Sequence, residues 1–181
     1  MGQRFDHIPA PQIEFIGRQK IFFVGTAGGP DTRVNISPKG MDSFRVLSPH
    51  RVMWLNTTGS GNETAAHLLE NQRMTIMFCA FEGKPLILRL YGTATAIHPR
   101  DASWVEHYSR FTPLPGARQI FDVSIELVQT SCGMAVPFFD YQEEREQLSN
   151  WATTKGPDGI QNYWTEKNQV SLDGKPTHIL S

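Results

Sequence analysis

The N-terminal half of the chain contains short apolar runs separated by turn residues, and this spacing is typical of β-strands. Lys20–Ala27 predicts a buried strand. Arg33–Ser37 follows the turn GGPD and predicts the second strand of a hairpin, which Pro38 is expected to end. Phe44–Leu47 and Val52–Leu55 flank the turn SPHR and therefore predict a second hairpin.

Longer runs predict further strands at Met74–Phe81, Leu86–Ile97 and Ile120–Thr130. The run Leu86–Ile97 has two usable faces. One face carries Leu86, Leu88, Leu90, Gly92, Ala94 and Ala96, and the other carries Arg89, Tyr91, Thr93 and Thr95. The small residues allow a neighbouring backbone or a flat ligand to come close. Because a single barrel needs to bury only one face, we expect the other to pack on a second copy of the chain.

Helical patterns occupy the remaining segments. They are Gln12–Gly17, the segment from the turn GSGN to about Asn71, Ala102–Phe111, and a charged segment from about Asp140. Six or more strands with few helices between them predict a mainly β (α+β) fold, an antiparallel barrel or sandwich with peripheral helices. The length of 181 residues fits a single domain, residues 1–181, with a helical C-terminal extension from about residue 140.

The composition argues against several classes of function. The 17 basic and 18 acidic residues give a net charge of -1, so we expect neither a nucleic-acid-binding surface nor a polybasic membrane patch. No apolar run approaches the ~18 residues of a membrane span. The N-terminus MGQRFDHIPAP lacks the apolar core of a signal peptide, so a cytoplasmic protein is expected. The 2 cysteines and 6 histidines lack the spacing of metal ligands, so no metal site is expected.

The turn GSGNET, residues 59–64, lies between a predicted strand and a predicted helix and allows several interpretations. A dinucleotide-binding fingerprint is disfavoured because Thr64 stands where the last glycine is needed and no βαβ pattern follows. A Walker loop fails because no lysine follows a second glycine at the required spacing. Ser60 and Glu63 fit a capping box, in which both side chains satisfy backbone N–H groups at the helix start. The same N–H groups also suit an anion.

Three basic residues favour the interpretation that the turn binds an anion. Arg33 and Lys39 lie on and just after one predicted strand, and Arg89 lies on a strand otherwise rich in apolar and small residues. Each alone is typical of a solvated or paired surface charge, but together with the polar turn they could neutralise a phosphomonoester. Cys132 could act as a nucleophile, yet no histidine partner is evident nearby, so a packing role before a proline turn is favoured.

Two pairs of segments resemble a known family. RVNISPKGMDSFRVL and VMWLNTTGSGNETAAHLLENQRMTIMFCAFEGKPLILRLYGTA are similar to the flavin-binding core of the pyridoxamine 5'-phosphate oxidase-like proteins, which are FMN-binding split β-barrels. The resemblance covers about Phe15 to Ile97 and keeps the family's order of strand, turn, helix and strand. TSCGMAVPFF and KNQVSLDGKP resemble an uncharacterised branch of the same family.

The resemblance implies a homodimer with FMN at the subunit interface, where each FMN is touched by both chains. The strand RVNIS would line the isoalloxazine ring, Lys39 would reach the phosphate or the pyrimidine edge, and the turn would hold the phosphate. The full set of residues expected to bind the cofactor is Arg33, Val34, Asn35, Ser37, Lys39, Thr57, Ser60, Gly61, Asn62, Glu63, Thr64 and Arg89.

Two departures from the family pattern bear on activity. Gly61 and Asn62 occupy the places of an Arg-Lys pair in the true oxidases, and the chain ends in DGKPTHILS where those enzymes carry an Arg-Leu-His segment that grips the substrate phosphate. We therefore expect an FMN-dependent oxidoreductase with an unknown small-molecule substrate or electron donor, not a true pyridoxamine phosphate oxidase. The residues name no catalytic acid or base. The alternatives are a non-catalytic flavin carrier or sensor, and a split barrel that binds haem or a deazaflavin.

Overall fold

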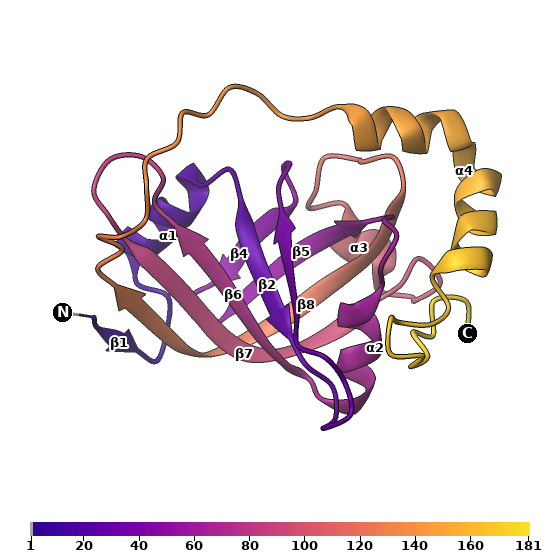
Figure 1. Ribbon diagram of the computed structural model, residues 1–181, viewed down its shortest axis with the longest axis horizontal. Helices are drawn as coiled ribbons and strands as arrows, with labels where there is room; N and C mark the ends of the chain where they lie inside the picture. The colour runs from indigo at the N-terminus through magenta and orange to yellow at the C-terminus, as the bar shows by residue number, and fades with distance from the viewer. Residues whose placement is uncertain (1) are drawn as a thin grey trace.

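An antiparallel β-sheet dominates the computed structural model, which describes residues 2–181 (Figure 1). Within these residues the eight strands are β1 (Arg4–Phe5), β2 (Phe22–Thr26), β3 (Asn35–Lys39), β4 (Phe44–Ser48), β5 (Arg51–Thr57), β6 (Arg73–Cys79), β7 (Ile87–Ile97) and β8 (Ala117–Ser131). They follow the order β3-β2-β6-β7-β8-β5-β4, and β1 pairs with β8. Because β3 and β4 remain as free edges, the sheet curls without closing, as the prediction of a split barrel requires.

The helices of the described residues are α1 (Ala10–Arg18), α2 (Glu63–Glu70), α3 (Trp104–Tyr108) and α4 (Gln147–Lys167). Both predicted hairpins are present, as the pairs β2/β3 and β4/β5. The prediction that Pro38 ends its strand is wrong, because β3 continues to Lys39 and Pro38 pairs with Phe23. A proline cannot donate a hydrogen bond to a further strand, but at the edge of a sheet no such strand is present.

The core lies on the inner face of the curled sheet, where Val24, Ile76 and Leu90 are fully buried. A second cluster around Met53 and Ile120 lies on the outer face of β5 and β8, beneath α3. No helix covers the outer face of β2, β6 and the first part of β7 within residues 2–181 (Figure 1). β7, the strand predicted at Leu86–Ile97, therefore has one buried face, and the first part of its other face is left open by residues 2–181.

Gly92 explains why β7 needs small residues. A Cβ atom at this position would lie 1.9 Å from the carbonyl oxygen of Ser124 in β8, at the point where the register of the two strands shifts. We predict that Gly92→Ala lowers the free energy of unfolding by about 3 kcal/mol, since the strands must move apart. Gly17→Ala in α1 meets nothing within 4 Å and should raise stability by about 0.5 kcal/mol. Urea titrations of both variants test this difference, and equal stabilities would contradict the close approach.

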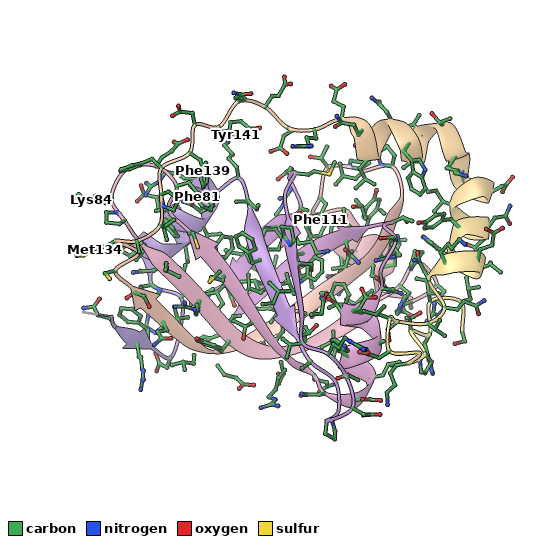
Figure 2. The ribbon with its side chains drawn as sticks, in the orientation of Figure 1. Phe81, Lys84, Phe111, Met134, Phe139 and Tyr141 are labelled. Carbon is green, nitrogen blue, oxygen red and sulfur yellow. The ribbon has the colours of Figure 1, made fainter. Side chains whose placement is uncertain are left out.

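The C-terminal part of the chain runs over one end of the barrel, from the end of β8 on the left of the view to α4 on the right (Figure 1). Residues 132–146 form an extended arm that leads from β8 to α4 (Figure 1). Phe139 of the arm packs against Phe81, with ring centroids 5.4 Å apart (Figure 2). The helix expected from about Asp140 begins only at Gln147, because residues 140–146 are all exposed and bury no apolar face.

The second half of α4 packs beside the turn that precedes α2. The helix bends at Gly156, which has a φ of 64°, and Pro157 follows directly. Ile160 and Trp164 then form a small cluster with Ile179. The Trp164 indole N–H donates to the Thr58 hydroxyl at 2.8 Å. This packing brings the end of α4 to residues 58–62.

Candidate functional site

The turn between β5 and α2 is held from behind through its carbonyl groups. Arg118 of β8 donates to the Gly59 oxygen at 3.3 Å and to the Gly61 oxygen at 2.9 Å. Asn168, the residue after α4, donates to the Gly59 oxygen at 3.0 Å and to the Ser60 oxygen at 3.4 Å. These carbonyls therefore face the protein interior.

The N–H groups of the same peptides point the other way, because the C=O and N–H of a trans peptide are opposed and the described residues include no cis peptide bond. Within residues 2–181, no hydrogen bond from the backbone N–H groups of residues 60–65 to a protein acceptor is present. The turn thus presents a set of free donors at the start of α2, which is the arrangement that binds anions.

The predicted capping box does not form. The N-cap of α2 is Asn62, and no side chain caps the helix. Ser60 is exposed, and the Glu63 carboxylate instead accepts a hydrogen bond from the Leu172 N–H at 3.3 Å. The Asn62 side chain donates to the Asn168 carbonyl at 3.2 Å, so tertiary contacts with the C-terminal segment replace the local cap. The N–H groups that a cap would have used remain free.

Lys39 lies at the end of β3 and turns inward across the open edge of the barrel. Its ammonium group lies 3.3 Å from the Asn56 amide oxygen of β5 and 5.3 Å from the centre of the Trp54 ring. Burial, with a smaller contribution from the charge of Arg118, lowers the pKa of Lys39 to about 8, although the charge of Glu63 acts in the opposite direction. Lys39 is therefore close enough to the turn to respond to its charges.

Arg118 is a buried cation, with only 3% of its surface exposed. Burial lowers the pKa of Arg118 to about 10, and Glu63 acts in the opposite direction. The guanidinium stays charged at neutral pH. Two cations, Lys39 and Arg118, thus share one carboxylate, Glu63, around the turn, and the surplus positive charge suits an anionic ligand.

A chain of buried polar side chains leads from Lys39 across the barrel. Asn56 accepts from Lys39 and donates from its amide nitrogen to the Gln119 oxygen at 3.1 Å. The Gln119 amide nitrogen lies 3.3 Å from Nε2 of His98 and must donate to it, so His98 carries its proton on Nδ1. Burial lowers the pKa of His98 to about 4, in agreement with a neutral ring. The chain fixes the orientation of the oxygen that Lys39 contacts.

Five buried polar atoms on β3, β5, α2 and β8 have no hydrogen-bond partner in the described part of the chain. They are Ser37 Oγ on β3, Trp54 Nε1 on β5, Asn62 Oδ1 and His67 Nε2 at α2, and Arg118 Nε on β8. Leaving a buried polar atom unpaired costs about 1–3 kcal/mol. Such a group of atoms indicates a place where a polar ligand or ordered water completes the hydrogen bonds.

The other residues predicted to bind the cofactor are divided between the inner face of β3, the turn before α2 and the outer face of the sheet. Asn35 and Ser37 share the inner face of β3 with Lys39, and Thr57 ends β5 next to the turn. Thr64 is buried in the first turn of α2. Arg33 lies just before β3 and pairs with Asp173.

Val34 and Arg89 belong to the outer face of the sheet. Val34 is 72% exposed, and Arg89 donates to the Ser131 hydroxyl at 3.1 Å. The chain therefore brings Lys39 to the turn and leaves Arg89 away from it. A groove of about 500 Å³ lies on the outer face next to β3 and is lined in part by Phe23, Val34 and Ile36.

Sequence reasoning missed Arg118, Gln119 and Asn168. An arginine and a glutamine side by side in an apolar strand, ARQIFDV, are the signal that could have identified the first two, because buried polar residues in a strand need partners. The role of Asn168 carries no local signal, since its contacts with the turn lie 106 to 109 positions away in the sequence.

The chain belongs to the pyridoxamine 5'-phosphate oxidase family, because residues 11–132 match the sequence profile of that family. It is similar to the pyridoxamine 5'-phosphate oxidase family protein ustO of Aspergillus flavus, with 38% identity over 178 residues that cover 88% of this chain and 71% of ustO.

Solved structures show the same split-barrel fold. A protein of Lactobacillus delbrueckii proposed to be a pyridoxamine 5'-phosphate oxidase aligns with a TM-score of 0.53 and 19% identity, over 68% of this chain and 94% of its own. A variant of HupZ from Group A Streptococcus aligns with a TM-score of 0.55 and 18% identity, over 68% and 99% of the two chains.

None of the helices in residues 2–181 is both long and apolar enough to cross a lipid bilayer. The same residues contain no group of three or more His, Cys, Asp or Glu side chains that could hold a metal ion.

Proposed function

We propose that this protein binds FMN and acts as a flavin-dependent oxidoreductase. The observation that carries the proposal is the turn at residues 59–64, which combines free N–H groups with two nearby cations, the half-buried Lys39 and the buried Arg118. A phosphate dianion satisfies both features at once. Membership of a family in which flavin is common supports FMN as the phosphate carrier.

The residues of the chain suit different parts of the cofactor. The turn residues Ser60, Gly61, Asn62, Glu63 and Thr64 would surround the phosphate, with Thr57 beside them. The inner face of β3 offers Asn35, Ser37 and Lys39 to the polar edge of the ring or to the phosphate. Arg33, Val34 and Arg89 would contribute across the interface of a dimer.

FMN would supply hydride or electron transfer, and the protein would bind, orient and shield the ring. The unpartnered Ser37 hydroxyl and His67 Nε2 are available as hydrogen-bond partners for a ring or sugar oxygen. We place the protein in the cytoplasm, where the free thiols of Cys79 and Cys132 would stay reduced. We propose a substrate other than pyridoxamine phosphate, because DGKPTHILS stands where the true oxidases carry their Arg-Leu-His segment.

Two experiments on the FMN-loaded protein test the activity. Anaerobic addition of NADH or NADPH should bleach the flavin absorption, and an added electron acceptor should restore it with repeated turnover. Bound FMN that stays oxidised with both donors, or that is reduced without turnover, would favour a carrier or sensor in place of an enzyme. Turnover of pyridoxamine phosphate at a rate comparable to a true oxidase would contradict the substrate part of the proposal.

FMN affinity should depend on pH through Lys39. The pKa of Lys39 is lowered to about 8 in the free protein, and a bound phosphate dianion would raise it, so above about pH 8 binding requires the uptake of a proton. The dissociation constant for FMN is expected to rise about 10-fold per pH unit above that point, until the pKa of the complex is reached. Fluorescence titrations between about pH 7 and pH 9 measure this. Riboflavin and the Lys39→Met variant provide controls, and equal slopes for FMN and riboflavin would contradict the assignment.

A further inference from the structure

The proposed phosphate turn has no cationic side chain of its own, since residues 59–64 read GSGNET. Its nearest guanidinium belongs to Arg118, 57 positions later in the sequence, which lies behind the turn and contacts two of its carbonyls. The positive charge is thus separated from the solvent-facing side of the turn by a single layer of peptide groups.

Asn168 fixes the position of Arg118. The Asn168 amide oxygen accepts from the Arg118 guanidinium at 2.9 Å, while its amide nitrogen donates to the Gly59 and Ser60 carbonyls. Asn168 is fully buried, and its own carbonyl accepts from Asn62 and Thr177. Together, Arg118 and Asn168 hold the carbonyls of residues 59–61 toward the protein interior. The N–H groups of residues 60–62 therefore point toward solvent.

The side chains around the turn carry two positive charges, on Arg118 and Lys39, and one negative charge, on Glu63. Arg118 is buried and Lys39 is half-buried, and Glu63 is the carboxylate whose charge acts on both of them. The Glu63 carboxylate lies against Gly61, so close that a Cβ atom at Gly61 would clash with it. Glu63 therefore partly neutralises the site where the phosphate would bind, and a dianion would have to compete with it.

We infer that Arg118, held by Asn168, is the positioning residue of the phosphate turn, where it supplies the positive charge and aims the N–H groups of residues 60–62 at the ligand. The inference rests on the proposed FMN function and assigns the source of its phosphate selectivity. Glu63 opposes phosphate binding and sets an upper limit to the affinity.

The first test compares FMN with riboflavin, which lacks the phosphate, in Arg118 variants. Arg118→Met should weaken FMN binding by roughly 10- to 100-fold and leave riboflavin binding within about 2-fold. Arg118→Lys retains the charge and should recover part of the loss for FMN. Unchanged FMN affinity in Arg118→Met, or equal losses for FMN and riboflavin, would overturn the inference. Absence of FMN binding by the unmodified protein would instead overturn the proposed function.

The second test does not depend on the folding of an Arg118 variant. Glu63→Gln keeps an acceptor for the Leu172 N–H and removes the opposing charge, so FMN binding should tighten by about 3- to 10-fold. Glu70→Gln, at the other end of the same helix, is the matched control and should leave FMN affinity unchanged. Weaker or unchanged FMN binding in Glu63→Gln would overturn the inference.

A spectroscopic measurement separates the electrostatic role from a structural one. NMR of protein labelled with ¹³C at lysine Cε reports the pKa of Lys39 directly. That pKa should rise in Arg118→Met, because the repelling charge is removed, and should also rise on adding inorganic phosphate to the unmodified protein. A Lys39 pKa that does not respond to either change would show that Arg118 only supports the fold.

Discussion

FMN affinity is expected to fall about 100-fold when Lys39 is replaced by methionine. Lys39 is half-buried, and within residues 2–181 its ammonium group donates only to the Asn56 amide oxygen at 3.3 Å, so it has donors left for a ligand. A hydrogen bond between charged groups, such as an ammonium and a phosphate, contributes roughly 1.5–3 kcal/mol, and loss of the charge adds to this. The fold should tolerate the change, because methionine keeps the length of the side chain and removes a half-buried charge.

Calorimetric titration with FMN and riboflavin measures the effect. Riboflavin should bind to Lys39→Met about as well as to the unmodified protein, because the ring contacts remain. Lys155→Met, an exposed lysine on α4, is the matched control and should leave both affinities unchanged. If Lys39→Met weakened FMN and riboflavin equally, Lys39 would contact the ring and the phosphate assignment would be wrong.

The second large effect concerns assembly, since Ile36→Glu is expected to convert a dimer into a monomer. Val34 and Ile36 next to the open edge are 72% and 69% exposed, and they border the groove on the uncovered outer face of the sheet. A contiguous apolar surface of this kind is typical of an interface. A glutamate at position 36 would have to be buried in the interface without a partner, which a dimer interface does not tolerate.

Light scattering coupled to size exclusion tests the assembly. The unmodified protein should have the mass of a dimer, and Ile36→Glu the mass of a monomer with much weaker FMN binding. Val105→Glu on α3 is the control, because Val105 is 76% exposed but lies over the covered part of the barrel. A monomeric unmodified protein with FMN bound, or a dimeric Ile36→Glu variant, would contradict the predicted interface.

The pattern of hydrophobic residues predicted the sheet well, because strands such as β2, β6 and β7 bury one face and alternate accordingly, while β5, buried on both faces, reads as a continuous apolar run. Both hairpins and the two faces of β7 follow from residues that are close in sequence. Gly92 could be singled out as a position of close approach, although its partner Ser124 could not. The strand end at Pro38 was wrong because the rule against proline applies to interior strands, and β3 lies at an edge.

The candidate site was predictable only in its local parts. Lys39 and the turn were found because they lie on one continuous strand-turn-helix pattern. Ser60 was expected to cap α2, but the C-terminal segment binds the same turn and shifts the helix start to Glu63. Arg118 and Asn168 reach the turn from 57 and 109 positions away, and no local periodicity carries information about such contacts.

The most direct test of the central claim is a titration of the purified, cofactor-free protein with FMN and with riboflavin, followed by visible absorption and calorimetry. The account predicts a structured flavin spectrum, saturation below roughly 10 µM FMN, and riboflavin binding weaker by 10-fold or more. Absence of FMN binding at roughly 50 µM, or equal affinities for FMN and riboflavin, would contradict it.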